Sequence, residues 1–122
     1  MKFRFPDLVG RYRLELTDEL LAFIERVFVD LAPASERAAV REEALLEARG
    51  SELEAYPDGT LVSRSRGQEF FRVKVDPDGA ELEELAFEKS AGAAVRLEMR
   101  DPDTVVAHQA GKFTAIFRRA AG

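Results

Sequence analysis

Hydrophobic and polar residues alternate along the first patterned stretch of the chain, from Leu8 to Leu16. A period of two places successive side chains on opposite faces of a β-strand. One face carries Leu8, Gly10, Tyr12, Leu14 and Leu16. The other face carries Val9, Arg11, Arg13 and Glu15. The pattern therefore predicts a strand with one buried face and one exposed face.

The period then changes to that of a helix, from Thr17 to Leu31. The apolar residues of this segment fall on one face of a helix. They are Leu20, Ile24, Val27, Phe28 and Leu31. Thr17 is placed to cap the first N–H groups of the helix. Phe23 and Val29 lie off the stripe, so they offer a second apolar surface for an oligomer contact.

Pro33 interrupts the helical pattern, and a second helix is predicted from about Ala34 to Arg49. Its inward residues are expected to be Val40, Ala44, Leu45 and Ala48. Gly50 is expected to end this helix in the left-handed conformation, which glycine adopts readily. The strand is thus followed by two helices joined by a short turn.

From Ser51 onward the period returns to two, in seven short segments separated by turn sequences. The segments are 51–56, 60–66, 68–75, 80–89, 93–100, 104–109 and 113–119. Alternation breaks at Glu83 and Glu84, where a β-bulge is expected. Together with the first strand, these segments predict eight strands in an antiparallel meander.

Eight strands with one apolar face must hide that face, and three arrangements do so. The sheet can close into a barrel with the helices capping its open end, fold into two packed sheets, or curve around the helices. We favour the barrel because the chain ends in a strand rather than in a long helix. The expected fold is mainly β: an eight-stranded antiparallel up-and-down meander closed into a small barrel. The chain would form one domain, 1–122, with a two-helix insertion at about 17–49.

Composition narrows the function classes. The chain is 46% apolar and 34% charged, which is typical of a globular domain. Its formal net charge of −5 argues against binding to nucleic acid. The absence of cysteine excludes disulfides and thiolate chemistry. Because we find neither a signal peptide nor an apolar run of about 18 residues, we expect a cytoplasmic protein without a membrane span.

Two motifs and the element order resemble the calycin superfamily, which includes lipocalins and fatty-acid-binding proteins, and especially small bacterial lipocalin-like proteins. Gly10-Arg11-Tyr12 resembles the Gly-x-Trp of the first calycin strand, with tyrosine in place of tryptophan. Phe117-Arg118-Arg119 is similar to the end of the last strand, where a basic residue packs over that ring. The helix pair lies where fatty-acid-binding proteins have a helical lid. Their carboxylate-binding Arg-x-Tyr is missing near the C-terminus, so carboxylate recognition is not carried over.

The resemblance implies a barrel that binds a small hydrophobic or amphiphilic ligand, with lipid as one class. We predict a structural closure of the barrel in which Gly10, Tyr12, Arg118 and Arg119 join the first strand to the last. An arginine stacked on an aromatic ring contributes about 0.5–2 kcal/mol.

The candidate ligand-binding residues are Arg64, Phe71, Arg72, His108 and Phe113. Arg64 and Arg72 belong to the one basic patch, and if they pointed inward they would bind an acidic head group. We favour the alternative, an exposed and solvated sheet face.

His108, the only histidine, has the pKa range of an acid–base catalyst but has no evident partner in the sequence. We therefore favour a sheet residue without a chemical role. No catalytic residue, metal site or cofactor is predicted, since carboxylates and one histidine make a poor metal-ligand set.

The expected function is non-catalytic ligand binding. The first alternative is a protein-interaction or structural domain without a cavity, including a homodimer. The second is a barrel enzyme of the isomerase or cyclase type, which would need an inward acid–base pair.

Overall fold

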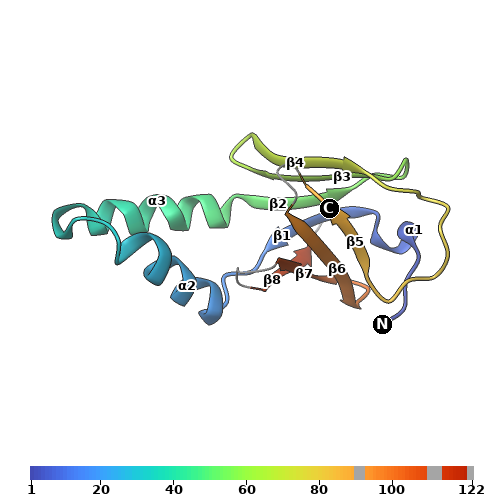
Figure 1. The fold of residues 1–122 in the computed structure, drawn as a ribbon, viewed down its shortest axis with the longest axis horizontal. Helices are drawn as coiled ribbons and strands as arrows, with labels where there is room; N and C mark the ends of the chain where they lie inside the picture. Colours follow the sequence, from blue (N-terminus) through green and yellow to red (C-terminus); the bar gives the residue numbers. More distant parts are fainter. Residues whose placement is uncertain (90–92, 110–113, 121–122) are drawn as a thin grey trace.

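Eight antiparallel strands form a single curved sheet in the order β4-β3-β2-β1-β8-β7-β6-β5. The computed structural model describes residues 1–89, 93–109 and 114–120. The strands are β1 (Gly10–Leu14), β2 (Ser51–Ala55), β3 (Thr60–Ser65), β4 (Gln68–Lys74), β5 (Leu85–Glu88), β6 (Ala94–Asp101), β7 (Thr104–Gln109) and β8 (Ala115–Arg119). The sheet curls into a nearly closed barrel (Figure 1). The prediction of a mainly β meander with a helical insertion after the first strand is confirmed.

Strand β1 lies in the middle of the sheet because it pairs with β2 on one side and β8 on the other. Tyr12 is opposite Leu53 of β2 and opposite Arg119 of β8. The two edges of the sheet are instead β4 and β5, from the middle of the chain. There the rings of Phe71 and Phe87 meet, with 5.3 Å between their centroids. Side-chain packing thus spans the seam where strand pairing stops.

The N-terminal segment closes one end of the barrel, which the sequence pattern did not predict. Residues Phe5–Leu8 form a short helix, α1, so the first strand begins at Gly10 rather than at Leu8. Phe3 and Phe5 are buried. Phe3 exchanges two backbone hydrogen bonds with Leu82, of 2.8 and 2.7 Å. Because Leu82 pairs with Phe3 and β5 starts only at Leu85, the strand expected over 80–89 is shortened and its bulge is not formed.

The insertion between β1 and β2 is a helical hairpin that projects from the opposite end of the barrel (Figure 1). It consists of α2 (Asp18–Ile24), a π-helical segment (Glu25–Val29), a short 3₁₀ turn (Ala34–Glu36) and α3 (Arg37–Arg49). Thr17 caps α2 as predicted, since its Oγ1 accepts a hydrogen bond of 3.1 Å from the Leu20 amide. No helix in the described part of the chain has the length and apolar character needed to cross a membrane.

The π-helical segment that follows α2 changes which side chains face the hairpin core. The Asp30 amide donates to the Glu25 carbonyl, five residues earlier, at 2.8 Å. A π turn holds one more residue than an α turn, so side chains beyond it rotate to a new face. Val29 is 1% exposed as a result, whereas Phe28 is 50% exposed. Phe28 and Leu31 belong to the apolar stripe of the sequence, but they are exposed in the structure.

Helix α3 packs as its pattern predicts, with Ala48 buried and Val40, Ala44 and Leu45 partly buried against α2. Its end differs from expectation, because Gly50 has φ −86° and not the left-handed conformation. Glycine is favoured at position 50 because neighbouring side chains leave little room for a Cβ, and not because of its backbone freedom. A Cβ on Gly50 would lie 3.1 Å from Cγ of Arg66 and 3.3 Å from Oγ of Ser65.

Candidate ligand-binding cavity

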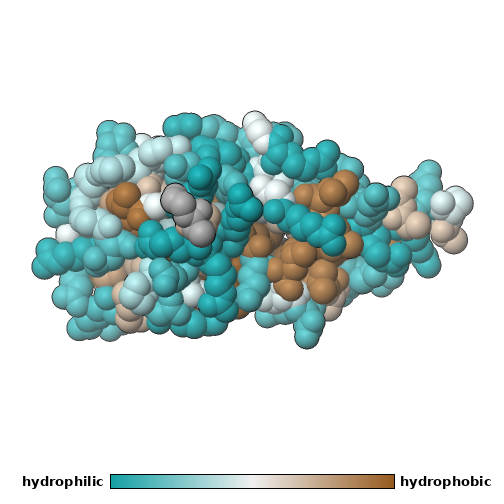
Figure 2. Space-filling view, turned by 180° about the vertical axis from the view of Figure 1, so that it is seen from behind, coloured by the Kyte–Doolittle hydropathy of each residue, from teal (hydrophilic) through white to brown (hydrophobic). Residues whose placement is uncertain are grey.

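A cavity of about 1150 Å³ lies between the helical hairpin and the open end of the barrel. Apolar side chains from both parts line it. The hairpin contributes Leu20, Phe23, Ile24, Val27 and Phe28. The barrel contributes Leu14, Leu53, Phe71, Val95, Leu97 and Phe117. Figure 2 shows the hydrophobic surface that gathers where the hairpin leaves the barrel.

The cavity occupies one end of the barrel because the other end is filled. Large buried side chains form a hydrophobic cluster there: Phe3, Phe5, Leu8, Tyr12, Leu61 and Met99. The same alternation that buries these residues turns Leu53, Leu97 and Phe117 inward at the hairpin end. At that end the helical hairpin lies over the barrel, and the space between them is the cavity.

The base of α3 is held over the barrel by two hydroxyl groups. Oγ of Ser65 and Oγ of Ser51 both donate to the Glu47 carbonyl, at 2.6 and 3.0 Å. Ser65 is a buried polar residue, and this bond satisfies it. On the outer side, Nη1 of Arg66 contacts Oε1 of Glu43 at 2.5 Å. These contacts connect α3 to the start of β2 and the end of β3, beside the cavity.

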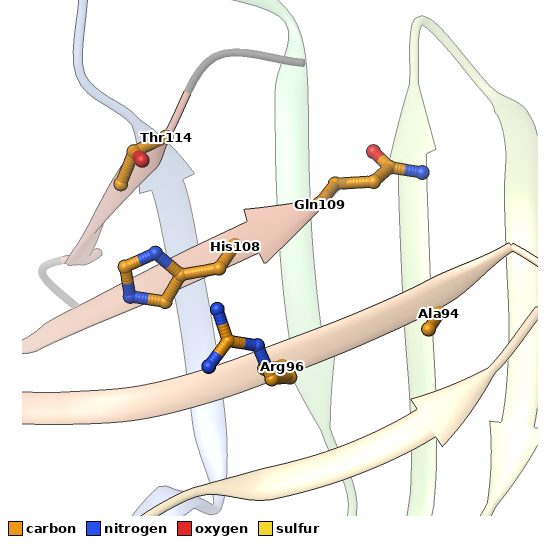
Figure 3. A pocket seen from close by; sticks show the side chains of 5 residues that line it. All are labelled: Ala94, Arg96, His108, Gln109 and Thr114. Atoms are coloured by element: carbon orange, nitrogen blue, oxygen red, sulfur yellow. The ribbon is translucent and has the colours of Figure 1, made fainter. Parts of the chain in front are cut away.

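Gln109 is the polar side chain that stands out in the barrel part of the cavity. It follows Val105 and Ala107 on the inward face of β7, and it lies opposite Val95 of β6. Figure 3 shows it extending away from Arg96 and His108. Its Nε2 is buried and has no hydrogen-bond partner among the described residues. The alternation of TVVAHQ places Gln109 on the same face as Val105 and Ala107, and this is the signal in the sequence for the inward amide.

Phe71 lines the cavity, but the two candidate arginines do not. Arg64 lies on the outer face of β3, where Nη1 contacts Oε1 of Glu54 at 2.8 Å and Nη2 donates to the Tyr56 hydroxyl at 3.3 Å. Hydrogen bonds to Tyr56 and Glu54 raise the pKa of the Arg64 guanidinium above its ordinary value. Arg72 pairs with Glu69 on the same outer face. Both arginines therefore lie on the outer face of the sheet, where each is paired with a carboxylate.

His108 also lies outside the cavity. Its Nε2 is 3.2 Å from Oε1 of Glu98, and it faces Arg96 across the β6–β7 pair. These side chains border a smaller outer pocket of about 280 Å³, lined by Ala94, Arg96, His108, Gln109 and Thr114 (Figure 3). The remaining candidate, Phe113, lies outside the described residues. The inward acid–base pair that an enzyme would need is thus not formed by His108.

The strand-closing contact is made by Arg119. Its guanidinium carbon lies 4.8 Å from the centroid of the Tyr12 ring, and Nη2 donates to the Tyr12 hydroxyl at 2.8 Å. That hydroxyl in turn donates to the Leu8 carbonyl at 2.7 Å. Arg118 points elsewhere, to Oγ1 of Thr104 at 3.1 Å. Of the two arginines considered, only Arg119 stacks on Tyr12.

Gly10 completes this contact. Its φ is +144°, and a Cβ at this position would collide with Nη1 of Arg119. Nη1 instead donates to the Val9 carbonyl at 2.9 Å. The glycine and the arginine are therefore linked sterically.

No group of three or more histidine, cysteine or acidic residues is arranged to hold a metal in the described part of the chain. A scan against protein-family models matched no family, and a search of the curated proteins gave no match. The cavity and its lining are therefore the features of the molecule that bear on its function.

Proposed function

We propose that this chain binds a small hydrophobic or amphiphilic ligand, without catalysis, in the cavity between the helical hairpin and the barrel. The observation that carries the proposal is the cavity itself, about 1150 Å³ with a largely apolar lining. Ligand sites are typically concave, about 300–1,000 Å³ and lined by hydrophobic and aromatic side chains with a few polar groups. An apolar space of this size gives no packing benefit to the empty protein, so a ligand is the natural occupant.

We further propose that the chain is a calycin-like binding protein. Three features support this relationship: the strand order of the barrel, the helical hairpin over its open end, and the contact among Gly10, Tyr12 and Arg119. The hairpin would act as the lid. A lipid or a similar elongated apolar molecule would lie between Phe28 of the hairpin and Phe71 of the barrel.

The test compares two alanine-to-tryptophan variants in binding of the uncharged dye Nile red. Ala107 lines the cavity, and the indole of Ala107→Trp would occupy part of its apolar space. Ala86 is an exposed residue of β5 and serves as the matched control. We expect Nile red to bind the parent chain and Ala86→Trp, and to lose at least tenfold in affinity for Ala107→Trp. Circular dichroism would verify that each variant is folded.

Native mass spectrometry of the freshly purified protein provides a second measurement. A co-purifying apolar molecule that disappears in Ala107→Trp would support the proposal. Equal dye binding by Ala107→Trp and the parent chain would contradict it.

Self-association is a second candidate function, favoured by the exposed apolar tip of the hairpin. Leu31 is 80% exposed and Phe28 is 50% exposed. Exposed apolar clusters of this kind mark protein contacts. If the tip joins two copies, sedimentation velocity will show a dimer that Leu31→Glu dissociates. A monomer at all concentrations would remove this candidate.

A further inference from the structure

We propose that the ligand is an uncharged amphiphile whose acceptor oxygen is bound by Nε2 of Gln109, rather than a fatty-acid anion. This inference rests on the proposed function, since it specifies the ligand of the same cavity. It is carried by two independent observations: the Gln109 amide nitrogen, which has no hydrogen-bond partner in the described part of the chain, and the charge of the lining.

Gln109 faces the cavity because of its position on β7. Val105 and Ala107 precede it on the inward face, and Val95 is its partner on β6. The barrel part of the lining also includes Leu97 and Phe117, whose side chains offer no acceptor. The amide nitrogen is nevertheless buried without a hydrogen-bond partner among the described residues.

A buried donor without an acceptor destabilises the protein that contains it. A leucine at the same inward position would avoid this penalty and continue the apolar face. The amide is therefore a polar group placed in an apolar wall, which is the arrangement that fixes a ligand's orientation. A carbonyl, ester or hydroxyl oxygen of the ligand would supply the missing acceptor.

The charges around the cavity disfavour an anionic head group. Its described lining contains three carboxylates, from Glu36, Glu43 and Glu47 of the hairpin, and one cation, Lys89. Arg66 pairs with Glu43 from outside the lining. Arg64 and Arg72, the cations that would suit a carboxylate ligand, are paired on the outer face of the sheet. A carboxylate in the cavity would be repelled by like charges, which an uncharged head avoids.

The experiment measures displacement of Nile red by three probes of similar chain length: methyl decyl ketone, dodecane and dodecanoate. The parent chain is compared with Gln109→Leu, which keeps the size of the side chain and removes the donor. We expect Gln109→Leu to weaken the ketone about three- to tenfold, the value of one hydrogen bond, and to leave dodecane unchanged. Dodecanoate should displace the dye less well than the ketone from the parent chain. Gln68→Leu, at an exposed position of β4, is the matched control and should change none of these values.

The melting temperature gives a reading that needs no ligand. Because Gln109→Leu removes an unpaired buried amide, the empty variant should melt at or above the temperature of the parent chain. If Gln109→Leu does not fold, Gln109→Met removes the same donor with a more adaptable side chain.

The possible failures are distinguishable. If the ketone binds parent and Gln109→Leu equally, or if dodecanoate is the tightest probe, the inference is overturned while the cavity remains a binding site. If neither Nile red nor any probe binds the parent chain, the proposed function fails and the inference fails with it.

Discussion

Arg119 uses its whole guanidinium where the first and last strands pair. Nη1 donates to the Val9 carbonyl, while Nη2 donates to the Asp7 and Pro102 carbonyls. The same group stacks on Tyr12 and lies near Asp103, with 3.4 Å between Nε and Oδ1. A guanidinium presents five donors in a fixed plane, which a lysine ammonium does not. One side chain therefore joins the N-terminal segment, the β6–β7 turn and the last strand.

Gly10→Ala tests the link between the glycine and Arg119. The new Cβ would collide with Nη1 of Arg119 and would also occupy φ +144°. We expect the free energy of unfolding to fall by about 2–4 kcal/mol. Gly67→Ala is the control for backbone strain alone, because Gly67 has φ +81° and open space around it. It should cost about 1–2 kcal/mol.

A double-mutant cycle separates the collision from the strain. In the Arg119→Ala background, Gly10→Ala should retain only its backbone cost, as measured by urea unfolding. An equal loss in both backgrounds would show that the guanidinium does not restrict position 10.

The buried phenol of Tyr12 is expected to make the protein less stable at alkaline pH. Burial raises the pKa of its phenol above the ordinary value, while Arg119 opposes that shift. The unfolded state therefore releases its proton at about pH 10, while the folded state still holds it. Stability contributed by Tyr12 is thus complete below about pH 10 and declines as the pH rises through the raised pKa, by at most about 1.4 kcal/mol per pH unit.

Tyr12→Phe removes this phenol and should flatten that part of the pH profile. The difference in unfolding free energy between parent and Tyr12→Phe is the quantity to follow, since lysines titrate in both. Absorbance titration in a Tyr56→Phe background isolates the phenol, because the chain has only two tyrosines. An ordinary pKa for Tyr12 would contradict the prediction.

At the scale of elements, the strands could be predicted because each buries one face. Val95, Leu97 and Met99 alternate with charged residues, and all three are buried as alternation requires. The pairing of the first strand with the last was also predicted, because Gly10-Arg11-Tyr12 and Phe117-Arg118-Arg119 resemble calycin motifs that meet between those strands. The seam between β4 and β5 was not, because Phe71 and Phe87 look like ordinary inward residues of separate strands.

The helical hairpin shows where periodicity fails. An α-helical period assigns Phe28 to the buried face, and only one added residue in the turn brings Val29 there. The N-terminal plug was missed because Phe3 and Phe5 lie in a stretch too short to show a period. Of the cavity, Phe71 was identified from the sequence. The inward amide of Gln109 was not predicted, because the candidate polar ligands were sought among the basic residues Arg64 and Arg72.

Deletion of Phe28 tests the π-helical segment. Removing one residue would restore α-helical spacing, and Val29 would keep its place in the hairpin core. We expect the melting temperature to change by only a few degrees, because an exposed residue is lost and the buried face is kept. Deletion of Glu42 in α3 is the matched control.

Glu42 is also exposed, but its helix has regular α-helical hydrogen bonding. Its deletion would turn Ala44, Leu45 and Ala48 away from α2 by about 100°. That deletion should lower the melting temperature far more than deletion of Phe28. Similar losses in both variants would mean that the π turn is not a removable insertion.

At the scale of the whole molecule, the two ends of the barrel have different tasks. One end is plugged by Phe3 and Phe5, which are 1% and 2% exposed. The other is covered by a hairpin whose apolar residues line an open cavity. Packing at the plugged end stabilises the barrel, and this leaves the hairpin end free to enclose the proposed ligand site.

A pair of phenylalanine substitutions tests this division. Phe5→Ala should lower the free energy of unfolding by about 3–5 kcal/mol, because it empties a closely packed end. Where Phe5→Ala stays folded, its Nile red affinity should match that of the parent chain. Phe28→Ala removes a half-exposed residue of the cavity lining, so its stability should stay within about 0.5 kcal/mol of the parent. Its Nile red affinity should nevertheless fall about three- to tenfold through lost apolar contact. Loss of stability without loss of affinity in Phe28→Ala would place this side chain in the hairpin core and remove it from the ligand site.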